Sequence, residues 1–290
     1  MSRSKLAGAA ALLAGAAGGF VYYGRKVEPD AIDVNRLWLR LPRLDPAFEG
    51  YRLVQISDIH TGPYMGADRL NRIVDLVNEQ QPNLIAITGD FVTDHEPYDE
   101  GALVAALRRF SAPDGVIAVL GNHDHRAGAE KIRVLLAESG VTDLSNQVHT
   151  LKRGDATLHL CGVDDVLARC DRLDEVVRAL PADGGAILLA HEPDFADLAA
   201  QTGRFDLQLS GHSHGGQINL PVLVRVVLPP YGRKYTRGLH WVEGMILYVN
   251  RGVGMLSLPL RFRARPEITV FLLAPETTGD SLPPDAVVRL

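Results

Sequence analysis

The chain has 290 residues, of which 46% are apolar and 22% are charged. This length and composition suit one large domain with a sizeable core. The formal net charge of −5 and the pI near 6.1 provide no general positive field for nucleic acid, so we expect no nucleic-acid partner. Cys161 and Cys170 are the two cysteines. Neither stands in a CxxC motif or a metal-ligand cluster, which disfavours a disulfide framework and a structural zinc site.

The first 26 residues differ from the rest of the chain. Two cations precede an uncharged run from Leu6 to Tyr23 that is rich in Ala, Gly and Leu, and two more cations close it. As a helix, this run would reach about 27 Å, close to the thickness of a membrane core, although its Ala and Gly make it weakly hydrophobic. A cleaved signal peptide with Ala14-Gly15-Ala16 at its end and a buried helix of the domain are the alternatives.

We therefore expect residues 1–26 to be a membrane anchor or a signal segment. Such a segment predicts a protein associated with the cell membrane through its N-terminus, and an exported catalytic domain if the segment is a signal. Cations flank the run on both sides, which leaves the side of the membrane open. The sequence indicates no oligomeric state.

The rest of the chain predicts a linker at residues 27–48, one globular domain at residues 49–275 and a surface tail at residues 276–290. In the domain, buried apolar runs typical of strands alternate with runs of helical periodicity. Strands are expected near residues 51–56, 84–87, 116–120, 158–161, 186–190, 207–209, 245–249 and 268–272. Helices are expected near residues 70–77, 103–110, 132–136, 172–180 and 194–200. This alternation predicts an α/β fold.

Short polar clusters directly follow five of the predicted strands. They are Ser57-Asp58-Ile59-His60, Gly89-Asp90, Gly121-Asn122-His123-Asp124, His191-Glu192-Pro193 and Gly211-His212-Ser213-His214. A single histidine or a Gly-Asp pair after a strand is weak evidence, because such residues are common in turns. Ligands of α/β sheets bind at the carboxyl ends of strands, however, and the combined carboxylates, carboxamide and imidazoles suit hard or borderline divalent cations. The clusters therefore predict one metal site.

The spacing within the clusters agrees with this hypothesis. In an extended chain, Asp58 and His60 would point to the same side and reach one ion. Gly211 is expected to give the backbone freedom that lets His212 and His214 face neighbouring ions. The carboxylate of Asp90 has two oxygens and is able to bridge two metals.

The order DxH, GD, GNHD, a lone His and GHxH resembles the calcineurin-like metallophosphoesterase superfamily. The N-terminal segment and the C-terminal third are similar to its membrane-associated YaeI/YkuE-like branch. The resemblance implies a four-layer αββα sandwich of two mixed β-sheets and two divalent ions, Mn²⁺ first and Zn²⁺ or Fe as alternatives. It assigns one metal to Asp58, His60 and His214, the other to Asn122, His191 and His212, the bridge to Asp90, and a catalytic imidazole to His123.

The resemblance implies a dinuclear metal-dependent phosphoesterase that hydrolyses phosphodiester or pyrophosphate bonds with metal-activated water. Cations mixed with apolar residues at 229–238, 250–254 and 259–263 suggest a lipid or envelope phosphate as substrate, for example UDP-2,3-diacylglucosamine of lipid A biosynthesis. The alternative for these cations is pairing with surface carboxylates. A nucleotide phosphodiesterase or nuclease is a second hypothesis. A non-catalytic scaffold is the third, and the full set of motif residues argues against it.

Several polar residues beside these clusters have open roles. Asp58 or Asp124 is expected to orient the ring of His123, with a solvated position as the alternative for Asp124. Asp94 is expected either to support the site or to serve in a turn. The remaining histidines are expected to be structural or exposed, with His125 the one most able to line a substrate pocket; they are His95, His125, His149, His159 and His240.

Overall fold

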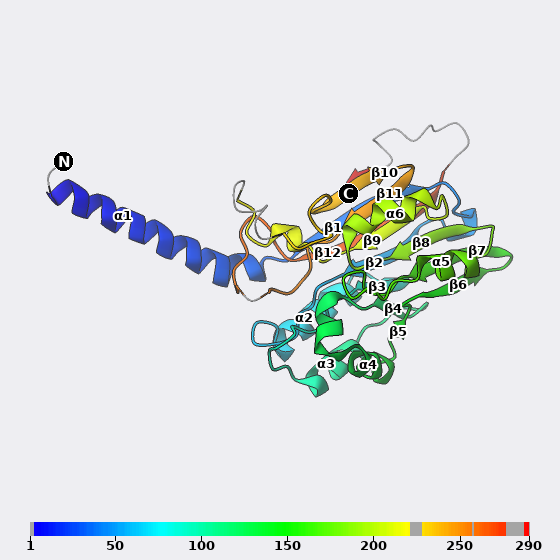
Figure 1. The fold of residues 1–290 in the computed structure, drawn as a ribbon, viewed down its shortest axis with the longest axis horizontal. Coiled ribbons are helices and arrows are strands. Elements are labelled where there is room, and N and C mark those ends of the chain that lie inside the picture. Colours follow the sequence, from blue (N-terminus) through cyan, green and yellow to red (C-terminus); the bar gives the residue numbers. More distant parts are fainter. Residues whose placement is uncertain (1–2, 221–227, 257, 277–286, 290) are drawn as a thin grey trace.

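The computed structural model describes residues 3–220, 228–256, 258–276 and 287–289. Its core consists of two mixed β-sheets that pack face to face, with helices on both outer surfaces (Figure 1). The first sheet has the strand order β13-β1-β12-β2-β3-β4-β5, and the second has the order β10-β11-β9-β8-β7-β6.

The first sheet combines a parallel half with antiparallel neighbours. Strands β2 to β5 are mutually parallel, β12 runs antiparallel to β2 and parallel to β1, and β13 runs antiparallel to β1. Its strands are β1 (Asp33–Leu41), β2 (Tyr51–Ile56), β3 (Leu84–Thr88), β4 (Val116–Val119), β5 (Thr142–Asp143), β12 (Glu267–Pro275) and β13 (Val287–Arg289).

The second sheet has four parallel strands, β11, β9, β8 and β7, flanked by the antiparallel edge strands β10 and β6. Its strands are β6 (Gln147–Arg153), β7 (Ala156–Gly162), β8 (Gly185–Leu189), β9 (Leu207–Ser210), β10 (Gly238–Val242) and β11 (Met245–Val249). The central strands β8, β9 and β11 are buried at every position, as expected for parallel strands covered on both faces.

Helices complete the outer layers. One apolar cluster joins the first sheet to α2 (Ala67–Asn78), α3 (Glu100–Leu107) and α4 (Asn122–Glu138). A second cluster fills the space between the sheets, and a third joins the second sheet to α5 (Leu173–Ala179) and α6 (Ala196–Gln201). Three apolar interfaces separate four layers, so the predicted αββα sandwich is confirmed.

Helix α2 shows how the sequence pattern produces this packing. Leu70, Ile73, Val74 and Val77 are fully buried against the first sheet. Their spacing of three and four residues places them on one face of the helix. The charged residues between them face away, so the helix stabilises the sheet with a single apolar stripe.

The segments expected to be a linker and a tail both contribute strands to the first sheet. Strand β1 lies in the expected linker and pairs with β12 over nine residues. The expectation missed the alternation of Leu37, Leu39 and Leu41, which are buried, with exposed Arg36 and half-exposed Trp38. Strand β13 lies in the expected tail and pairs with β1, while residues 277–286 of the tail lie outside the described residues.

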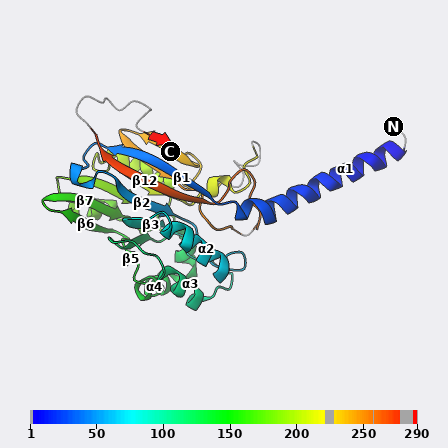
Figure 2. The ribbon, with the colours of Figure 1, turned by 180° about the vertical axis from the view of Figure 1, so that it is seen from behind.

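The N-terminal segment forms α1 (Arg3–Tyr22), which projects away from the two sheets in both views (Figures 1 and 2). At its end, the backbone oxygen of Gly24 accepts a hydrogen bond from Arg261 at 2.9 Å. A side chain at Gly24 would come within 2.6 Å of Leu260, so this close approach requires glycine. Among the helices that the structure describes, none is both long enough and apolar enough to cross a membrane.

The two sheets meet at the carboxyl ends of their parallel strands. Gln55 in β2 links the sheets there, because its side-chain nitrogen donates to Thr88 of β3 and to the backbone oxygen of Ser210 in β9, both at 3.0 Å. The loops that follow β2, β3, β4, β8 and β9 carry the five polar clusters, and this junction brings them together.

Candidate metal centre

Five of the motif residues have an unusual backbone conformation. The φ angles of Asp58, His60, Asp90, His212 and His214 lie between 50° and 66°. Residues other than glycine rarely adopt this left-handed region, and such strain concentrates at functional sites. The expectation of an extended Asp58-x-His60 segment was therefore wrong, because tight left-handed loops, and not the alternation of a strand, direct these side chains.

Gly211 serves the site through its small size. Its φ angle is not left-handed, which corrects the expectation that Gly211 supplies backbone freedom. A Cβ atom at this position would lie 2.8 Å from the Cβ of Ser57 and closer still to the carboxylate of Asp58. Glycine is required here because two loops from different sheets approach each other without room for a side chain.

The first group of converging side chains comprises Asp58, His60 and His214, all buried. The Nε2 atoms of His60 and His214 are 3.1 Å apart, and Oδ1 of Asp58 lies 3.3 Å from Nε2 of His214 and 3.9 Å from Nε2 of His60. Burial opposes ionisation of Asp58, but the neighbouring His214 holds the pKa of its carboxyl well below the usual value. Burial lowers the pKa of His60 to about 3.

The second group comprises Asp90, His191 and His212. Nε2 of His191 lies 3.1 Å from Oδ2 of Asp90 and 3.2 Å from Nδ1 of His212. The same Oδ2 atom of Asp90 lies 3.6 Å from Nε2 of His60 in the first group. Asp90 thus stands between the two groups. The side-chain amide of Asn122 completes the second group at 2.9 Å from Nδ1 of His212.

The hydrogen bonds of His191 and His212 show whether their free ring nitrogens can bind a cation. Nδ1 of His191 donates to the backbone oxygen of Thr88 at 2.6 Å, and Nε2 of His212 donates to the backbone oxygen of Pro230 at 2.9 Å. In neutral rings, the two remaining nitrogens then present lone pairs to each other beside the carboxylate of Asp90. The carboxylate of Asp90 favours positive charge at this place, because it raises the pKa of His191 well above its usual value against the opposing effect of burial. A divalent cation supplies such charge and accepts the lone pairs of the carboxylate and of both rings. The residues therefore fit a metal.

Asp124 holds the loops that carry the site. Its fully buried carboxylate accepts hydrogen bonds from the backbone nitrogens of Asp90 at 2.9 Å, Phe91 at 2.8 Å and Gly121 at 3.0 Å. Burial raises the pKa of Asp124 to about 7. Asp124 is therefore neither solvated nor directed at the ring of His123, and it fixes the ends of β3 and β4 relative to each other.

Asp94 orients the ring of His123, a role that the sequence had assigned to Asp58 or Asp124. Nδ1 of His123 contacts Oδ1 of Asp94, and the ring packs edge-on against His60 with 4.9 Å between centroids. Asp94 also accepts from Arg126 at 3.0 and 3.2 Å and lies 3.0 Å from Nε2 of the exposed His95. Burial lowers the pKa of His123. Asp94 lies 29 residues from His123 in the sequence. No sequence motif relates two residues at this separation, so their contact could not be predicted from the sequence.

A pocket of about 580 Å³ opens directly over the two groups. Its lining comprises Asp90, Asn122, His123, Arg126, Leu167, His212, Ser213, His214, Gly216, Gln217, Pro229, Pro230, Leu256 and Leu258. The apolar part of this lining, called the apolar wall below, consists of its leucines and prolines. Among the described residues of the lining, Arg126 is the one permanent cation, so the pocket combines a polar floor with an apolar wall.

Most of the cations expected to surround the site are engaged elsewhere. Arg251 pairs with Asp33 and Glu267, and Lys234 pairs with Asp197 at 2.7 Å. The buried guanidinium of Arg261 donates to backbone oxygens, including that of Ala264 at 2.7 Å. Pairing with acidic residues, the alternative reading of these segments, is therefore correct for Arg251 and Lys234.

The other histidines lie outside this pocket. His125 pairs with Asp164 at 2.7 Å, and His159 contacts Thr150 and the backbone oxygen of Asp183, both at 2.8 Å. His240 contacts a backbone oxygen at 3.1 Å, and His149 is exposed on β6. Both cysteines are free thiols.

Comparison with known proteins agrees with this geometry. The sequence profile of calcineurin-like phosphoesterases matches residues 51–216. The chain is 38% identical over 268 residues to the uncharacterized metallophosphoesterase YkuE of Bacillus subtilis, which covers 91% of this chain and 93% of that protein. It is 29% identical over 227 residues to phosphodiesterase YaeI of Escherichia coli, with 77% and 82% covered. It is also 33% identical over 258 residues to a transmembrane protein with metallophosphoesterase domain of Danio rerio, covering 84% of this chain and 57% of that protein.

The fold, the convergent carboxylates and imidazoles, and these relatives define a metal-dependent phosphohydrolase. The chain belongs to the calcineurin-like phosphoesterase family, as the order of its polar clusters had indicated.

Proposed function

We propose that this phosphohydrolase uses two divalent ions to cleave phosphodiester or pyrophosphate bonds in an amphiphilic phosphate. The observation that carries the proposal is the apolar wall of the pocket directly over the two side-chain groups. A polar floor of carboxylates and imidazoles suits the phosphoryl group, and the leucine and proline wall suits an apolar part of the same molecule. YaeI, named a phosphodiesterase, is a relative of similar length.

The proposed metal ligands follow the two groups. Asp58, His60 and His214 would hold one ion, and Asn122 would join His191 and His212 at the other, with Asp90 placed to contact both. When bound, the ions supply an acidified water nucleophile and offset the charge that develops on the phosphoryl oxygens. The backbone carbonyls at Thr88 and Pro230 hold the rings of His191 and His212 in the orientation that ligation requires.

His123 is the proposed catalytic imidazole. Asp94 holds Nδ1, so Nε2 carries a proton for the leaving oxygen only when the ring is an imidazolium. Burial lowers the pKa of His123 and opposes this form, whereas the carboxylates of Asp90 and Asp94 favour it. The backbone nitrogen of His123 donates to Oδ1 of Asp90 at 2.8 Å, so the loop that carries the imidazole is fixed to the proposed bridging carboxylate. This coupling keeps the ring in place relative to the reacting phosphoryl group.

The proposed substrate class is a lipid or envelope phosphate, with UDP-2,3-diacylglucosamine as its representative. Arg126 at the pocket provides one permanent positive charge beside the metals, whereas a nuclease needs an extended basic groove. We also propose that the N-terminal segment associates the enzyme with the cell membrane, because its uncharged run from Leu6 to Tyr23 is flanked by cations.

Substrate comparison tests the proposal. Full-length enzyme should hydrolyse UDP-2,3-diacylglucosamine and bis-p-nitrophenyl phosphate and should be slow on single- and double-stranded DNA. Leu258→Ser should raise KM for the lipid substrate about tenfold and leave bis-p-nitrophenyl phosphate nearly unchanged, because Leu258 lines the apolar wall. Leu198→Ser is the matched control, since Leu198 is similarly exposed (49% against 55%) and lies on α6, outside the lining.

Two results would refute the substrate assignment. Faster hydrolysis of DNA than of the lipid substrate would favour a nuclease. Equal effects of the two serine variants on both substrates would show that the apolar wall does not contact the lipid part. Cell fractionation with protease accessibility tests the location, and full-length, uncleaved protein found wholly in the cytosol would contradict it.

A further inference from the structure

Arg126 on α4 is held along one edge of its guanidinium. Its Nε and Nη2 donate to the two carboxylate oxygens of Asp94 at 3.0 and 3.2 Å. The same carboxylate contacts Nδ1 of His123. The side chain of Arg126 is 45% exposed and lines the pocket over the metal centre. Asp94 therefore fixes a permanent cation and the proposed catalytic imidazole side by side at this pocket.

The other edge of this guanidinium faces the side chain of Asn122. A guanidinium has five N–H donors, and Asp94 accepts from two of them. The side-chain oxygen of Asn122 accepts from Nη1 of Arg126 at 2.7 Å and from Nη2 at 2.6 Å. The amide nitrogen of Asn122 donates to Nδ1 of His212 at 2.9 Å. Asn122 thus accepts from the edge of Arg126 that Asp94 does not hold.

Ligation of a metal by Asn122 would end this pairing. An amide binds a metal through its oxygen, so the oxygen of Asn122 would have to turn toward His212 and the proposed second ion. The amide nitrogen would then lie where the oxygen lies now, 2.6 to 2.7 Å from two nitrogens of Arg126, with donors facing donors. This edge of Arg126 would need another acceptor, and the pocket is the space beside it.

A phosphoryl group is the acceptor that fits this edge. Two N–H donors of a guanidinium bind two phosphoryl oxygens at once. Arg126 is the one permanent cation among the described residues that line the pocket. Because Asp94 holds Arg126 beside His123, the proposed proton donor, the bound group lies on the side of the leaving oxygen. A leaving group that carries its own phosphoryl group is the second half of a diphosphate.

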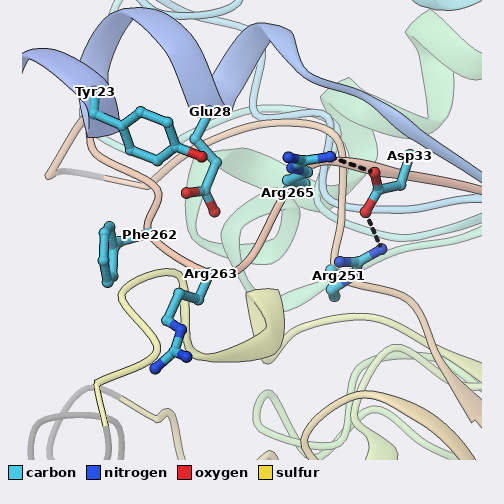
Figure 3. A pocket seen from close by; sticks show the side chains of 7 residues that line it. All are labelled: Tyr23, Glu28, Asp33, Arg251, Phe262, Arg263 and Arg265. Carbon is cyan, nitrogen blue, oxygen red and sulfur yellow. Dashed lines mark hydrogen bonds and ion pairs between the residues drawn. The ribbon is translucent and has the colours of Figure 1, made fainter.

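The arginines at the foot of α1 lack this arrangement. They line a separate pocket of about 440 Å³, where Arg251 and Arg265 both pair with Asp33. Figure 3 shows the guanidinium of Arg263 on the opposite side of that pocket from Arg265. As far as the chain is described, this pocket shares no lining residue with the pocket over the metal centre. Of the arginines described at these two pockets, Arg126 is therefore the one placed to bind a phosphate beside the metals.

We propose that Arg126 binds the second phosphoryl group of a diphosphate diester and makes diphosphates the preferred substrates over simple phosphodiesters. This inference rests on the proposed function and names the bond that the same site cleaves. The hydroxyl of water stays on the attacked phosphorus, and the bond from that phosphorus to the bridging oxygen breaks. The bridging oxygen leaves with the electron pair as part of the second phosphate, which Arg126 holds, and takes up the remaining proton of the water. Two phosphate monoesters result.

Calorimetric titration of the full-length, Mn²⁺-loaded protein with two inert ligands tests the proposal. The first is the symmetrical dimethyl ester of methylenediphosphonate, in which a CH₂ bridge replaces the cleavable oxygen, and the second is dimethylphosphinate, which has one phosphoryl group and no ester bond. Arg126→Gln should weaken binding of the diphosphonate about tenfold, because it removes charge-assisted hydrogen bonds. It should change binding of dimethylphosphinate by no more than about twofold. In hydrolysis, kcat/KM for UDP-2,3-diacylglucosamine should fall about tenfold relative to kcat/KM for bis-p-nitrophenyl phosphate.

Arg109→Gln is the matched control, because the side chain of Arg109 is also 45% exposed, pairs with Asp75 and lies outside the lining of this pocket. This variant should bind both ligands as the wild type does. An equal loss for both ligands in Arg126→Gln would show that Arg126 only supports Asp94 and His123, and it would overturn the proposal, as would wild-type affinity for the diphosphonate. The titration measures binding, whereas the proposed function is tested by hydrolysis, so the two can fail separately.

Discussion

Gly121→Ala tests whether the close packing around Asp90 is required for catalysis. The backbone of Gly121 has φ −114°, which alanine adopts freely, so the substitution adds volume without backbone strain. The new Cβ atom would lie 2.8 Å from both Cγ and the backbone nitrogen of Asp90 and closer still to its Oδ1, so the overlap exceeds about 0.6 Å relative to ordinary contact at 3.4 Å. The carboxylate of Asp90 must therefore move, and with it the hydrogen bond to the backbone nitrogen of His123.

We expect this displacement to cost about 1–3 kcal/mol of stability, as overpacking of a filled site does. A catalytic group misplaced by about 1 Å costs up to 100-fold in rate, so a shift of this size should lower kcat roughly 10- to 100-fold. The assay is hydrolysis of bis-p-nitrophenyl phosphate, together with metal content per chain and urea unfolding. Gly66→Ala is the control, because no atom lies within 4 Å of a Cβ at that position. Wild-type kcat and metal content in Gly121→Ala would refute the assignment of Asp90.

Three further predictions concern the same side chains and their neighbours. Asp94→Asn should lower kcat about 10- to 100-fold at unchanged metal content, because the ring of His123 loses its charged acceptor; an unchanged rate would contradict the role of Asp94. A chelator should abolish hydrolysis, and added Mn²⁺ should restore it. Asp90→Asn should reduce the amount of metal bound per chain. Full activity of the metal-free protein would refute the mechanism. His125 donates a hydrogen bond to the carboxylate of Asp164, and this bond raises the pKa of His125 above 6.5. The pair therefore stabilises the fold fully below that pH and loses its contribution as the pH rises through the raised pKa. His125→Gln should therefore cost about 1 kcal/mol at pH 6 and less at pH 9 by urea unfolding, and equal costs at the two pH values would exclude the linkage.

The limits of sequence interpretation are clearest at the first sheet. Strands β2, β3 and β4 could be predicted because their apolar runs are continuous and their neighbours in the sheet follow closely in the chain. Strand β1 pairs with β12, more than 220 residues later, and presents a mixed alternation of charged and apolar residues that does not distinguish a strand from an irregular segment. Pairing with so distant a partner is a property of the complete fold.

The sequence by itself determined which residues gather at the metal centre. Buried strands and the polar residues that follow them are local patterns, and parallel strands place their carboxyl ends at one edge by geometry alone. Only the tertiary structure showed which of the nearby carboxylates, Asp94 or Asp124, contacts the ring of His123. Asp124 and Asp94 both lie near His123 in the fold, yet one holds backbone nitrogens in a fully buried position and the other holds the imidazole. Their roles depend on loops that lie about 30 residues apart and meet only when the sheet has formed, so only the tertiary structure could assign them.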